Sequence, residues 1–408
     1  MSDFALSNAF SLDTAKFPLP ARAALKLLER LKHGQLAVTF PDGQRADFGR
    51  HDGSERADLQ LGNWNVVKAA LRDGDIGFAE SWIAGDWSTS DLPRLMTLLV
   101  RNRNSIDAAV YGRFSGRLLH RLRHWLNRNT RAQSKRNIHA HYDLGNDFYA
   151  LWLGDSMTYS SALFGSDASV PGDADLERGH AAKYCRVLDQ LQLKRGGRLL
   201  EIGCGWGGLA ATAAKAGHAV TGLTLSQRQL DHARQSLAKA VLPGDLRLQD
   251  YRDEHTQYDG IASIEMFEAV GEAYWPSYFA TLKRCLTPGG RACVQTITID
   301  DALFDRYRAG SDFIQQYIFP GGMLPSPSAF RMHAERAGLV IVDELRFGSD
   351  YAHTLRLWRQ RFTAQLAAVR ALGFDERFIR TWSFYLAYCE AAFAGGNTDV
   401  MHFTLVAR

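Results

Sequence analysis

Residues Leu199 to Gly208 read LLEIGCGWGG, and this stretch decides the expected fold. An apolar strand carries Glu201 near its end, and Gly203, Gly205 and Gly207 follow at single-residue spacing. Glycine has no Cβ, so it tolerates positive φ and lets the backbone turn tightly beside a bound ligand. A helix that opens at Gly208 would aim its unpaired N–H groups at the same ligand. The pattern therefore predicts a strand–turn–helix unit that binds a nucleotide-like cofactor.

The spacing of the glycines separates several kinds of cofactor site. A P-loop needs Gly-Lys-Ser or Gly-Lys-Thr after the turn, which this chain lacks. We read the glycines at the pitch Gly203-x-Gly205-x-Gly207 rather than as the dinucleotide pattern G-x-G-x-x-G, although Gly208 also satisfies the latter. The tighter Gly-x-Gly-x-Gly pitch is the form found in methyltransferases that use S-adenosylmethionine (SAM). A glycine-rich turn without a ligand is the structural alternative.

The bulk composition is that of an ordinary globular protein. Of the 408 residues, 46% are hydrophobic and 23% are charged, which allows a large core and favours two units. No apolar run reaches the roughly 18 residues of a membrane-spanning helix, and the first residues lack the order of a signal peptide. We therefore expect a cytoplasmic protein. Five scattered cysteines without a C-x-x-C pair argue against disulfides and against a metal site.

One segment is strongly basic, although the net charge of the chain is only +4. Between Ala108 and Tyr142 there is no acidic residue, and Arg or Lys recurs beside an apolar stripe at helical spacing. Such a helix suits an anionic membrane surface, where each cation contributes about 1 kcal/mol. A core-facing helix with solvated arginines is the alternative. No nucleic-acid motif accompanies the charges, so we expect no nucleic-acid partner.

The chain divides into two expected domains. Residues 1–130 form a smaller, mostly helical, lipid-facing domain with helices at Ala21–Lys32 and Leu92–Asn102. Residues 131–408 form the catalytic domain, where strands and helices alternate as in a parallel sheet with right-handed crossovers. Residues 298–325 are a long aromatic loop, which we interpret as a lid. The expected strands are Arg198–Ile202, Ala219–Leu223, Leu246–Gln249, Gly260–Ile264, Ala292–Ile297, Leu339–Leu345 and Met401–Val406, with helices at Ser226–Ala240 and Trp275–Cys285.

Further motifs follow the glycine turn. Thr224-Leu-Ser-x-x-Gln229 comes after the second strand, Gln249-Asp-Tyr-Arg252 after the third, and Met266-Phe-Glu-x-Val-Gly271 after the fourth. With His141-Tyr-Asp-Leu-Gly-Asn146 and Met157-Thr-Tyr-Ser160, this set resembles the cyclopropane-fatty-acid and mycolic-acid synthases, a family of SAM-dependent lipid methyltransferases. The resemblance implies an α/β fold with a Rossmann-like class I SAM methyltransferase sheet beside the smaller N-terminal domain.

The resemblance also implies where SAM binds. The glycine turn would hold its methionyl part, the Thr224 motif its ribose region, and the Tyr251 motif its adenine edge. The Tyr159 motif would close over the sulfonium. The cofactor-binding residues expected on this basis are Tyr159, Ser160, Glu201, Gly203, Cys204, Gly205, Gly207, Thr224, Leu225, Gln229, Tyr251 and Arg252.

The reaction in this family sets further requirements. Methylation of an isolated alkene creates a carbocation, which needs a dry pocket with negative or π-rich walls. Closing a cyclopropane then needs a base, and in this family a bound bicarbonate is thought to be that base. Candidate aromatic side chains for the pocket wall are Phe267, Trp275, Tyr278, Phe304, Tyr307, Tyr317 and Tyr351.

The resemblance assigns the bicarbonate to a Glu, a His, a Tyr and two backbone N–H groups. Gln295 stands where the family has His, and its amide can hydrogen-bond but cannot titrate. Cys389 matches a cysteine discussed as catalytic, with a buried inert thiol as the alternative. The residues expected to bind SAM thus match the family motifs, whereas the residues expected to hold the base differ from them at Gln295. The matching positions of the base site are Glu268, Tyr351, Gln295, Ser161 and Ile297.

The sequence therefore predicts SAM-dependent C-methylation of the double bond in unsaturated acyl chains of membrane phospholipids, of the cyclopropane-synthase type. The alternative product is a methyl-branched unsaturated chain, which a diene substrate would favour. A small-molecule methyltransferase is disfavoured by the basic segment, and an inactive lipid-binding module by the retained glycine turn. We expect a peripheral protein on the inner face of an anionic membrane. A homodimer would reinforce weak membrane binding and stays an open alternative.

Overall fold

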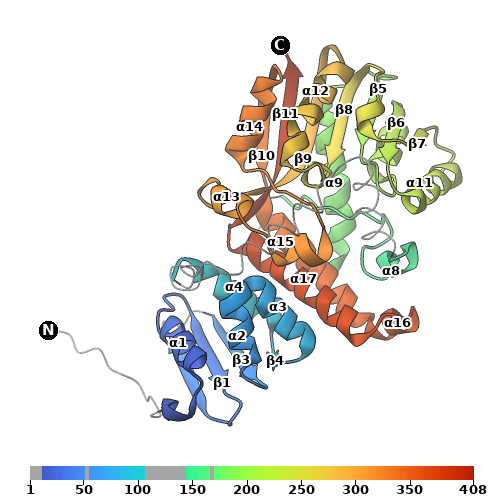
Figure 1. Cartoon of the computed structure of the whole chain (residues 1–408). Helices are drawn as coiled ribbons and strands as arrows, with labels where there is room; N and C mark the ends of the chain where they lie inside the picture. The colour runs from blue at the N-terminus through green and yellow to red at the C-terminus, as the bar shows by residue number, and fades with distance from the viewer. Residues whose placement is uncertain (1–11, 51–54, 106–143, 166–169) are drawn as a thin grey trace. The chain divides into compact units, whose positions relative to one another are not determined.

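The computed structural model describes residues 12–50, 55–105, 144–165 and 170–408 (Figure 1). The chain forms two compact units, Met1–Leu122 with Phe374–Gly395, and Arg123–Gly373 with Gly396–Arg408. The N-terminal unit thus includes a segment near the end of the chain, which the sequence analysis had assigned to the catalytic domain.

The basic segment Ala108–Tyr142 and the predicted domain boundary at 130/131 lie outside the described residues, as does the start of the His141 motif. In the part of the chain that the structure describes, no helix is both long and apolar enough to cross a bilayer.

The N-terminal unit contains a four-stranded sheet of order β2-β1-β3-β4 beside its helices. The predicted helices are present as α1 and α4, but the sheet was missed, because its strands are short and β2 buries only Phe48. Helix α17 packs against α3 and α4. The elements of this unit are β1 (Gln35–Thr39), β2 (Arg45–Gly49), β3 (Arg56–Leu61), β4 (Trp87–Ser88), α1 (Leu19–Leu28), α2 (Asn65–Asp73), α3 (Asp75–Ala84), α4 (Leu92–Arg101) and α17 (Glu376–Ala394).

The second unit is built on a seven-stranded sheet of order β10-β11-β9-β8-β5-β6-β7. Neighbouring strands from β9 to β7 run parallel, and β11 pairs antiparallel with both β9 and β10. All seven predicted strands are present, and their ends shift by up to three residues, except that β9 begins six residues before the predicted Ala292. The strands are β5 (Arg198–Ile202), β6 (Ala219–Thr224), β7 (Asp245–Leu248), β8 (Tyr258–Ile264), β9 (Leu286–Ile299), β10 (Leu339–Arg346) and β11 (Thr398–Ala407).

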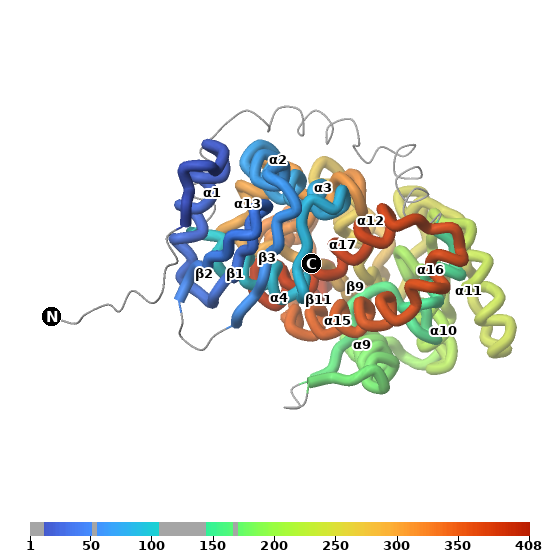
Figure 2. Tube along the Cα trace, turned by 90° about the horizontal axis from the view of Figure 1, so that it is seen from below, coloured from blue at the N-terminus to red at the C-terminus, as the bar shows by residue number. Residues whose placement is uncertain are grey.

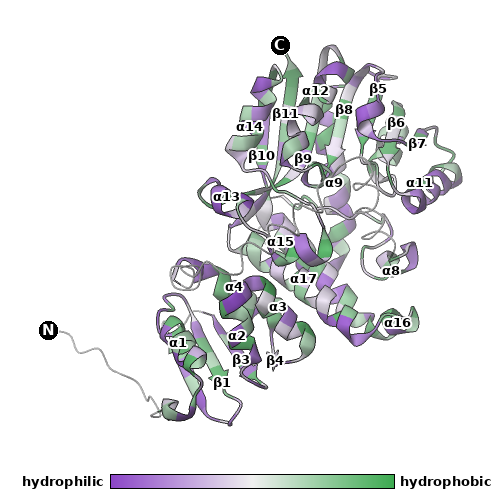
Figure 3. Cartoon of the chain, in the orientation of Figure 1, coloured by the Kyte–Doolittle hydropathy of each residue, from purple (hydrophilic) through white to green (hydrophobic). Residues whose placement is uncertain are grey.

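Helices cover both faces of this sheet, because successive strand residues point to opposite sides. Leu199 joins a core cluster with α9, α10 and α11, whereas Leu200 joins a cluster with α12 and α14. Figure 2 shows α9 and α12 on opposite sides of β9. Figure 3 shows α11 as largely hydrophilic, as expected for a helix that buries one side only. The helices of this unit are α8 (Asn146–Ala150), α9 (Leu176–Leu191), α10 (Gly208–Lys215), α11 (Gln227–Lys239), α12 (Trp275–Cys285), α13 (Asp301–Arg308), α14 (Pro327–Arg336), α15 (Gly348–Ala364) and α16 (Leu366–Ala371).

The segment 298–325 is not the long loop that the sequence analysis expected. It contains α13 and a short π-helix, Ile314–Ile318. The buried Gln315 side chain donates hydrogen bonds to the Tyr307 hydroxyl (3.0 Å) and the Gly322 carbonyl (2.9 Å). These polar contacts within the segment favour a compact insertion, a feature that the aromatic composition did not indicate.

Candidate active site

A cavity lies at the carboxyl ends of β5, β6 and β8, where the strand order of the parallel sheet reverses. In open α/β sheets this edge is the usual ligand-binding site. The glycine turn borders the cavity, and Gly203 and Gly205 have φ values of +85° and +51°, a region that L side chains rarely adopt. A Cβ at Gly203 would lie 2.9 Å from Met266 Cγ, so this position also requires glycine for space.

Most of the predicted cofactor-binding residues border this one cavity. The exception is Gly207, which caps the start of α10 and packs against Ala233 of α11. The predicted residues that line the cavity are Tyr159, Ser160, Glu201, Gly203, Cys204, Gly205, Thr224, Leu225, Gln229, Tyr251 and Arg252.

Glu201 gives the cavity an acidic wall. Its side chain is buried, and its Oε2 atom has no hydrogen-bond partner among the described residues. Burial raises the pKa of this carboxyl to about 8, against the lowering effects of a backbone hydrogen bond and of the Lys183 charge. A buried carboxylate oxygen without a partner is costly, so the position suits a positively charged ligand group such as the ammonium of SAM.

Local hydrogen bonds shape the ribose side of the cavity. The Thr224 hydroxyl donates to Gln229 Oε1 (3.1 Å) and accepts the Ser226 N–H (3.1 Å). Ser226 caps α11 by accepting the Gln229 N–H. The three polar side chains of this motif thus hold the β6–α11 turn in one conformation, with Thr224 and Gln229 on the cavity wall.

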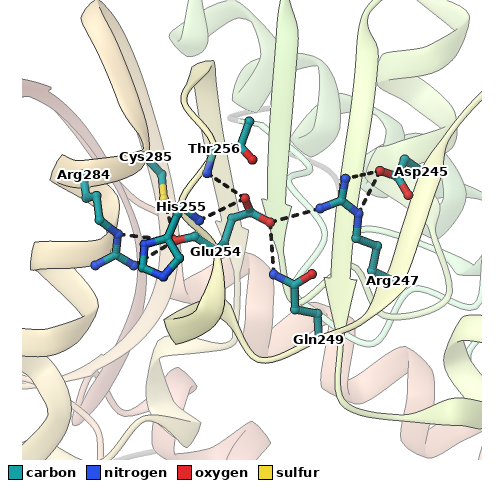
Figure 4. A network of polar contacts seen from close by, with 8 residues as sticks. All are labelled: Asp245, Arg247, Gln249, Glu254, His255, Thr256, Arg284 and Cys285. Atoms are coloured by element: carbon teal, nitrogen blue, oxygen red, sulfur yellow. Dashed lines mark hydrogen bonds and ion pairs between the residues drawn. The ribbon is translucent and has the colours of Figure 1, made fainter.

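A polar network anchors the turn that carries Tyr251 and Arg252. The buried Glu254 carboxylate accepts hydrogen bonds from Arg247, Gln249 and the backbone N–H groups of His255 and Thr256 (Figure 4). Burial opposes ionisation, but these hydrogen bonds hold the pKa of Glu254 below its usual value. The network fixes the chain directly after the cavity residues.

The structure adds a residue that the sequence analysis missed. The partly buried Glu265 side chain lines the cavity, and the backbone φ of this residue is +48°. Its Oε1 accepts hydrogen bonds from the Ser161 N–H (2.8 Å) and Gln295 Nε2 (2.7 Å), and its Oε2 accepts one from the Tyr351 hydroxyl (2.7 Å). Non-glycine residues held in this backbone region cost about 1–2 kcal/mol and cluster at functional sites. Its position directly after β8 was the signal available in the sequence.

The predicted base-site residues therefore separate into two groups. Ser161, Gln295 and Tyr351 contact Glu265, whereas Glu268 accepts hydrogen bonds from the Ile297 N–H and from the Thr296 hydroxyl (3.0 Å). Glu268 does not line the cavity, and its Oε2 has no partner among the described residues. Burial and the nearby Glu265 charge raise the pKa of Glu268 to about 8.

These contacts bear on whether bicarbonate fits the site. The Ser161 and Ile297 N–H groups, Gln295 and Tyr351 all donate to carboxylates of the chain itself. The donors that the resemblance assigns to bicarbonate are thus engaged, and the residues present do not favour a further anion between them.

A buried lysine lies behind the cavity wall. Lys183 of α9 is fully buried, donates to the Ser160 hydroxyl and lies 4.6 Å from the centre of the Tyr184 ring. Burial lowers the pKa of Lys183 to about 7, although the charges of Glu265 and Glu201 oppose this effect. A cation near two buried carboxylates favours their ionised forms. The sequence analysis had no signal for Lys183, because a helical lysine is normally exposed.

Other candidates lie elsewhere. Cys389 is on α17 in the N-terminal unit and does not line the cavity. Phe267, Trp275 and Tyr278 are fully buried members of the core cluster beside α12, so they are packing residues. Tyr159 on the cavity wall contacts further rings: it lies edge-on to Trp152 with ring centroids 5.5 Å apart, and tilted against Trp358 at 5.4 Å.

The sheet and its cavity define a class I SAM-dependent methyltransferase. The chain belongs to the mycolic acid cyclopropane synthetase family, whose family model matches residues 129–403. The α/β fold and the enzyme class predicted from the sequence are confirmed.

Relatives with assigned activities support this membership. Tuberculostearic acid methyltransferase UfaA1 of Mycobacterium tuberculosis is 42% identical over 348 residues, which cover 82% of this chain and 79% of the relative. Cyclopropane-fatty-acyl-phospholipid synthase of Escherichia coli is 35% identical, covering 84% of this chain and 86% of the relative. The solved cyclopropane synthase MmaA2 of M. tuberculosis superposes with a TM-score of 0.61 at 30% identity, covering 66% of this chain and 97% of that structure.

The cofactor is likewise supported by a solved relative. The mycolic acid cyclopropane synthase CmaA1, in complex with S-adenosylhomocysteine (SAH), has a TM-score of 0.61 and 31% identity over 66% of this chain and 97% of that structure. SAH is what remains of SAM after methyl transfer. The chain is thus a SAM-dependent lipid methyltransferase.

Proposed function

We propose that this protein methylates a double bond in an unsaturated acyl chain of a phospholipid and yields a methyl-branched unsaturated chain. The observation that carries the proposal is Glu265, a partly buried carboxylate on the cavity wall with three hydrogen-bond donors around it. It provides the base that the reaction needs, from the chain itself.

The cavity residues have distinct roles in binding SAM. Gly203 and Gly205 would let the backbone approach the methionyl part, and the unpaired Glu201 oxygen would bind its ammonium group. Thr224 and Gln229 would bind the ribose, with Leu225 beside them, and Tyr251 and Arg252 would border the adenine, since all five line the cavity. Tyr159 and Ser160 would lie next to the sulfonium, where the Tyr159 ring would face its positive charge.

The electron and proton balance assigns a role to Glu265. When bound, SAM supplies a methyl group on a positively charged sulfur. The π electron pair of the alkene forms the new C–C bond, and the C–S electron pair stays on sulfur. The acyl chain is then a carbocation, which the Glu265 carboxylate stabilises. Glu265 next accepts a proton from a carbon beside the cation, and the C–H electron pair forms the new double bond.

The altered base site favours the branched product over the cyclopropane. Gln295 replaces a titratable His, and Glu265 takes up the donors that the resemblance assigns to a mobile anion. The relative at 42% identity is named a tuberculostearic acid methyltransferase and not a cyclopropane synthase, which supports this choice, whereas the Escherichia coli relative at 35% supports ring formation as the second candidate.

We further propose peripheral binding to an anionic membrane. The basic segment between Ala108 and Tyr142 supports this, because its cations would lie near anionic headgroups. SAM turnover is to be measured with unsaturated phospholipid in anionic and in neutral vesicles. Turnover that does not depend on lipid would contradict the lipid assignment, and equal rates on both vesicle types would contradict the electrostatic part.

Analysis of the lipid product tests the central proposal. The protein is expressed in a host whose phospholipids contain one defined unsaturated chain, and the lipids are analysed by mass spectrometry and proton NMR. We expect a methyl doublet with retained vinylic signals. A strained-ring methylene signal would establish the cyclopropane instead, and unmodified lipid would refute both candidates. An empty vector and Glu265→Gln serve as controls.

A further inference from the structure

The Gln295 amide lies between two buried polar groups. Its Nε2 donates to Glu265 Oε1 at 2.7 Å, and its Oε1 is 2.8 Å from Nε2 of His402. Gln295 on β9 and His402 on β11 are directly opposite each other in the antiparallel pair, and both are fully buried. The sheet register thus provides a histidine immediately behind the position where the family resemblance expects one.

The chemistry of the three groups orients the amide. A carboxylate only accepts hydrogen bonds, so the NH₂ end of Gln295 must face Glu265. Its oxygen then faces His402, and this contact requires a proton on His402 Nε2. The other ring nitrogen, Nδ1, has no partner among the described residues, as expected for the nitrogen without a proton. If the amide turned over, its oxygen would oppose a carboxylate oxygen.

We propose that His402 is a positioning residue: its Nε2–H holds the Gln295 amide in the orientation that donates to Glu265. The inference rests on the proposed function only for its kinetic consequences, because the orientation itself is a property of the folded protein. A purely packing role is the competing explanation, since the ring also contacts Phe347 with centroids 4.8 Å apart.

The charged neighbours are consistent with a neutral ring. Burial lowers the pKa of His402 to about 3, and the charges of Arg186 and Lys183 act in the same direction. The titratable groups that interact with Glu265 are Lys183 of α9, Glu268 beyond β8 and Tyr351 of α15, and Glu201 of β5 interacts with the same Lys183. Arg186 in turn pairs with Asp343 of β10. At neutral pH His402 is therefore a donor through one nitrogen only.

Two substitutions separate positioning from packing. His402→Phe keeps an aromatic ring but removes the donor, and His402→Gln can place an amide N–H near the position of Nε2. Loss of one hydrogen bond to a carboxylate raises the pKa of that carboxylate by about one unit. We expect His402→Phe to move the acid limb of the turnover profile upward by about that amount, without changing the KM for SAM. His402→Gln should restore the limb.

The measurements also include readouts that need no activity. ¹⁵N NMR of the histidine ring should show the Nε2–H tautomer, and an Nδ1–H tautomer would overturn the proposal. A uniform loss of turnover with an unmoved acid limb in His402→Phe would likewise establish packing. If His402→Phe does not fold, the ring tautomer of the wild-type protein still decides between the two roles. A wild-type protein that leaves lipids unmodified refutes the proposed function, whereas the tautomer is then still measurable.

Discussion

Substitution of Glu265 by Gln separates the chemistry of this carboxylate from its structural role. Glutamine has nearly the same shape, and its amide oxygen can accept the Ser161 and Gln295 N–H groups as Glu265 Oε1 does. Its NH₂ group can donate to the Tyr351 oxygen, whose hydroxyl rotates. The change therefore preserves the contacts and removes only the charge and the ability to accept a proton.

The expected effect on the reaction is large. Loss of a positioned general base costs 10²- to 10⁴-fold in rate, which corresponds to about 3–5 kcal/mol of transition-state stabilisation. Burial raises the pKa of Glu265, so replacing it with a neutral side chain should leave the melting temperature unchanged or slightly higher. The KM for SAM should change much less than kcat, because the ammonium, ribose and adenine sites do not include this residue.

The assay is SAM turnover on vesicles of one unsaturated phospholipid, with SAM affinity measured by calorimetry. Glu268→Gln is the matched control, since that residue is partly buried like Glu265 but does not line the cavity. From the sequence alone we expect a strong loss of turnover in Glu268→Gln as well. Because Glu268 does not line the cavity, we expect this loss to be smaller than the loss in Glu265→Gln. Turnover of Glu265→Gln within threefold of wild type, or a larger loss in Glu268→Gln, would refute the assignment of the base.

Three further substitutions test the cavity. The pKa of Glu201 in the folded protein is about 8, well above its unfolded value, so the stability of the SAM-free protein should fall as pH rises from about 4.5 to 8. Glu201→Gln should flatten this pH dependence in melting curves. The same substitution should weaken SAM binding in calorimetry. Gly203→Ala places a Cβ 2.9 Å from Met266 Cγ in a residue with positive φ. It should therefore lower the stability by at least about 1 kcal/mol and reduce SAM affinity. An unchanged stability and an unchanged SAM affinity would show that the turn is not constrained. Cys389→Ser should keep turnover within about twofold of wild type, since this thiol lies outside the cavity, and a tenfold loss would restore its catalytic assignment.

Much of the catalytic unit is predictable from local sequence. The strand Arg198–Ile202 and the helix Trp275–Cys285 have the predicted bounds, because apolar periodicity and turn residues act over a few positions. The glycine turn predicted the cofactor site for the same reason. The short strands of the N-terminal unit and the helices within 298–325 lack such signals, and both were missed.

The base site shows where local reasoning ends. Sequence alone determined that this chain has a parallel sheet with a SAM turn, and it found Ser161, Gln295 and Tyr351 one by one. Only the tertiary structure decided that all three donate to Glu265, and that His402 stands behind Gln295. The reason is physical: hydrogen bonds form between groups a few ångströms apart in space, and the register of β9 with β11 and the docking of α15 bring together residues that lie far apart along the chain.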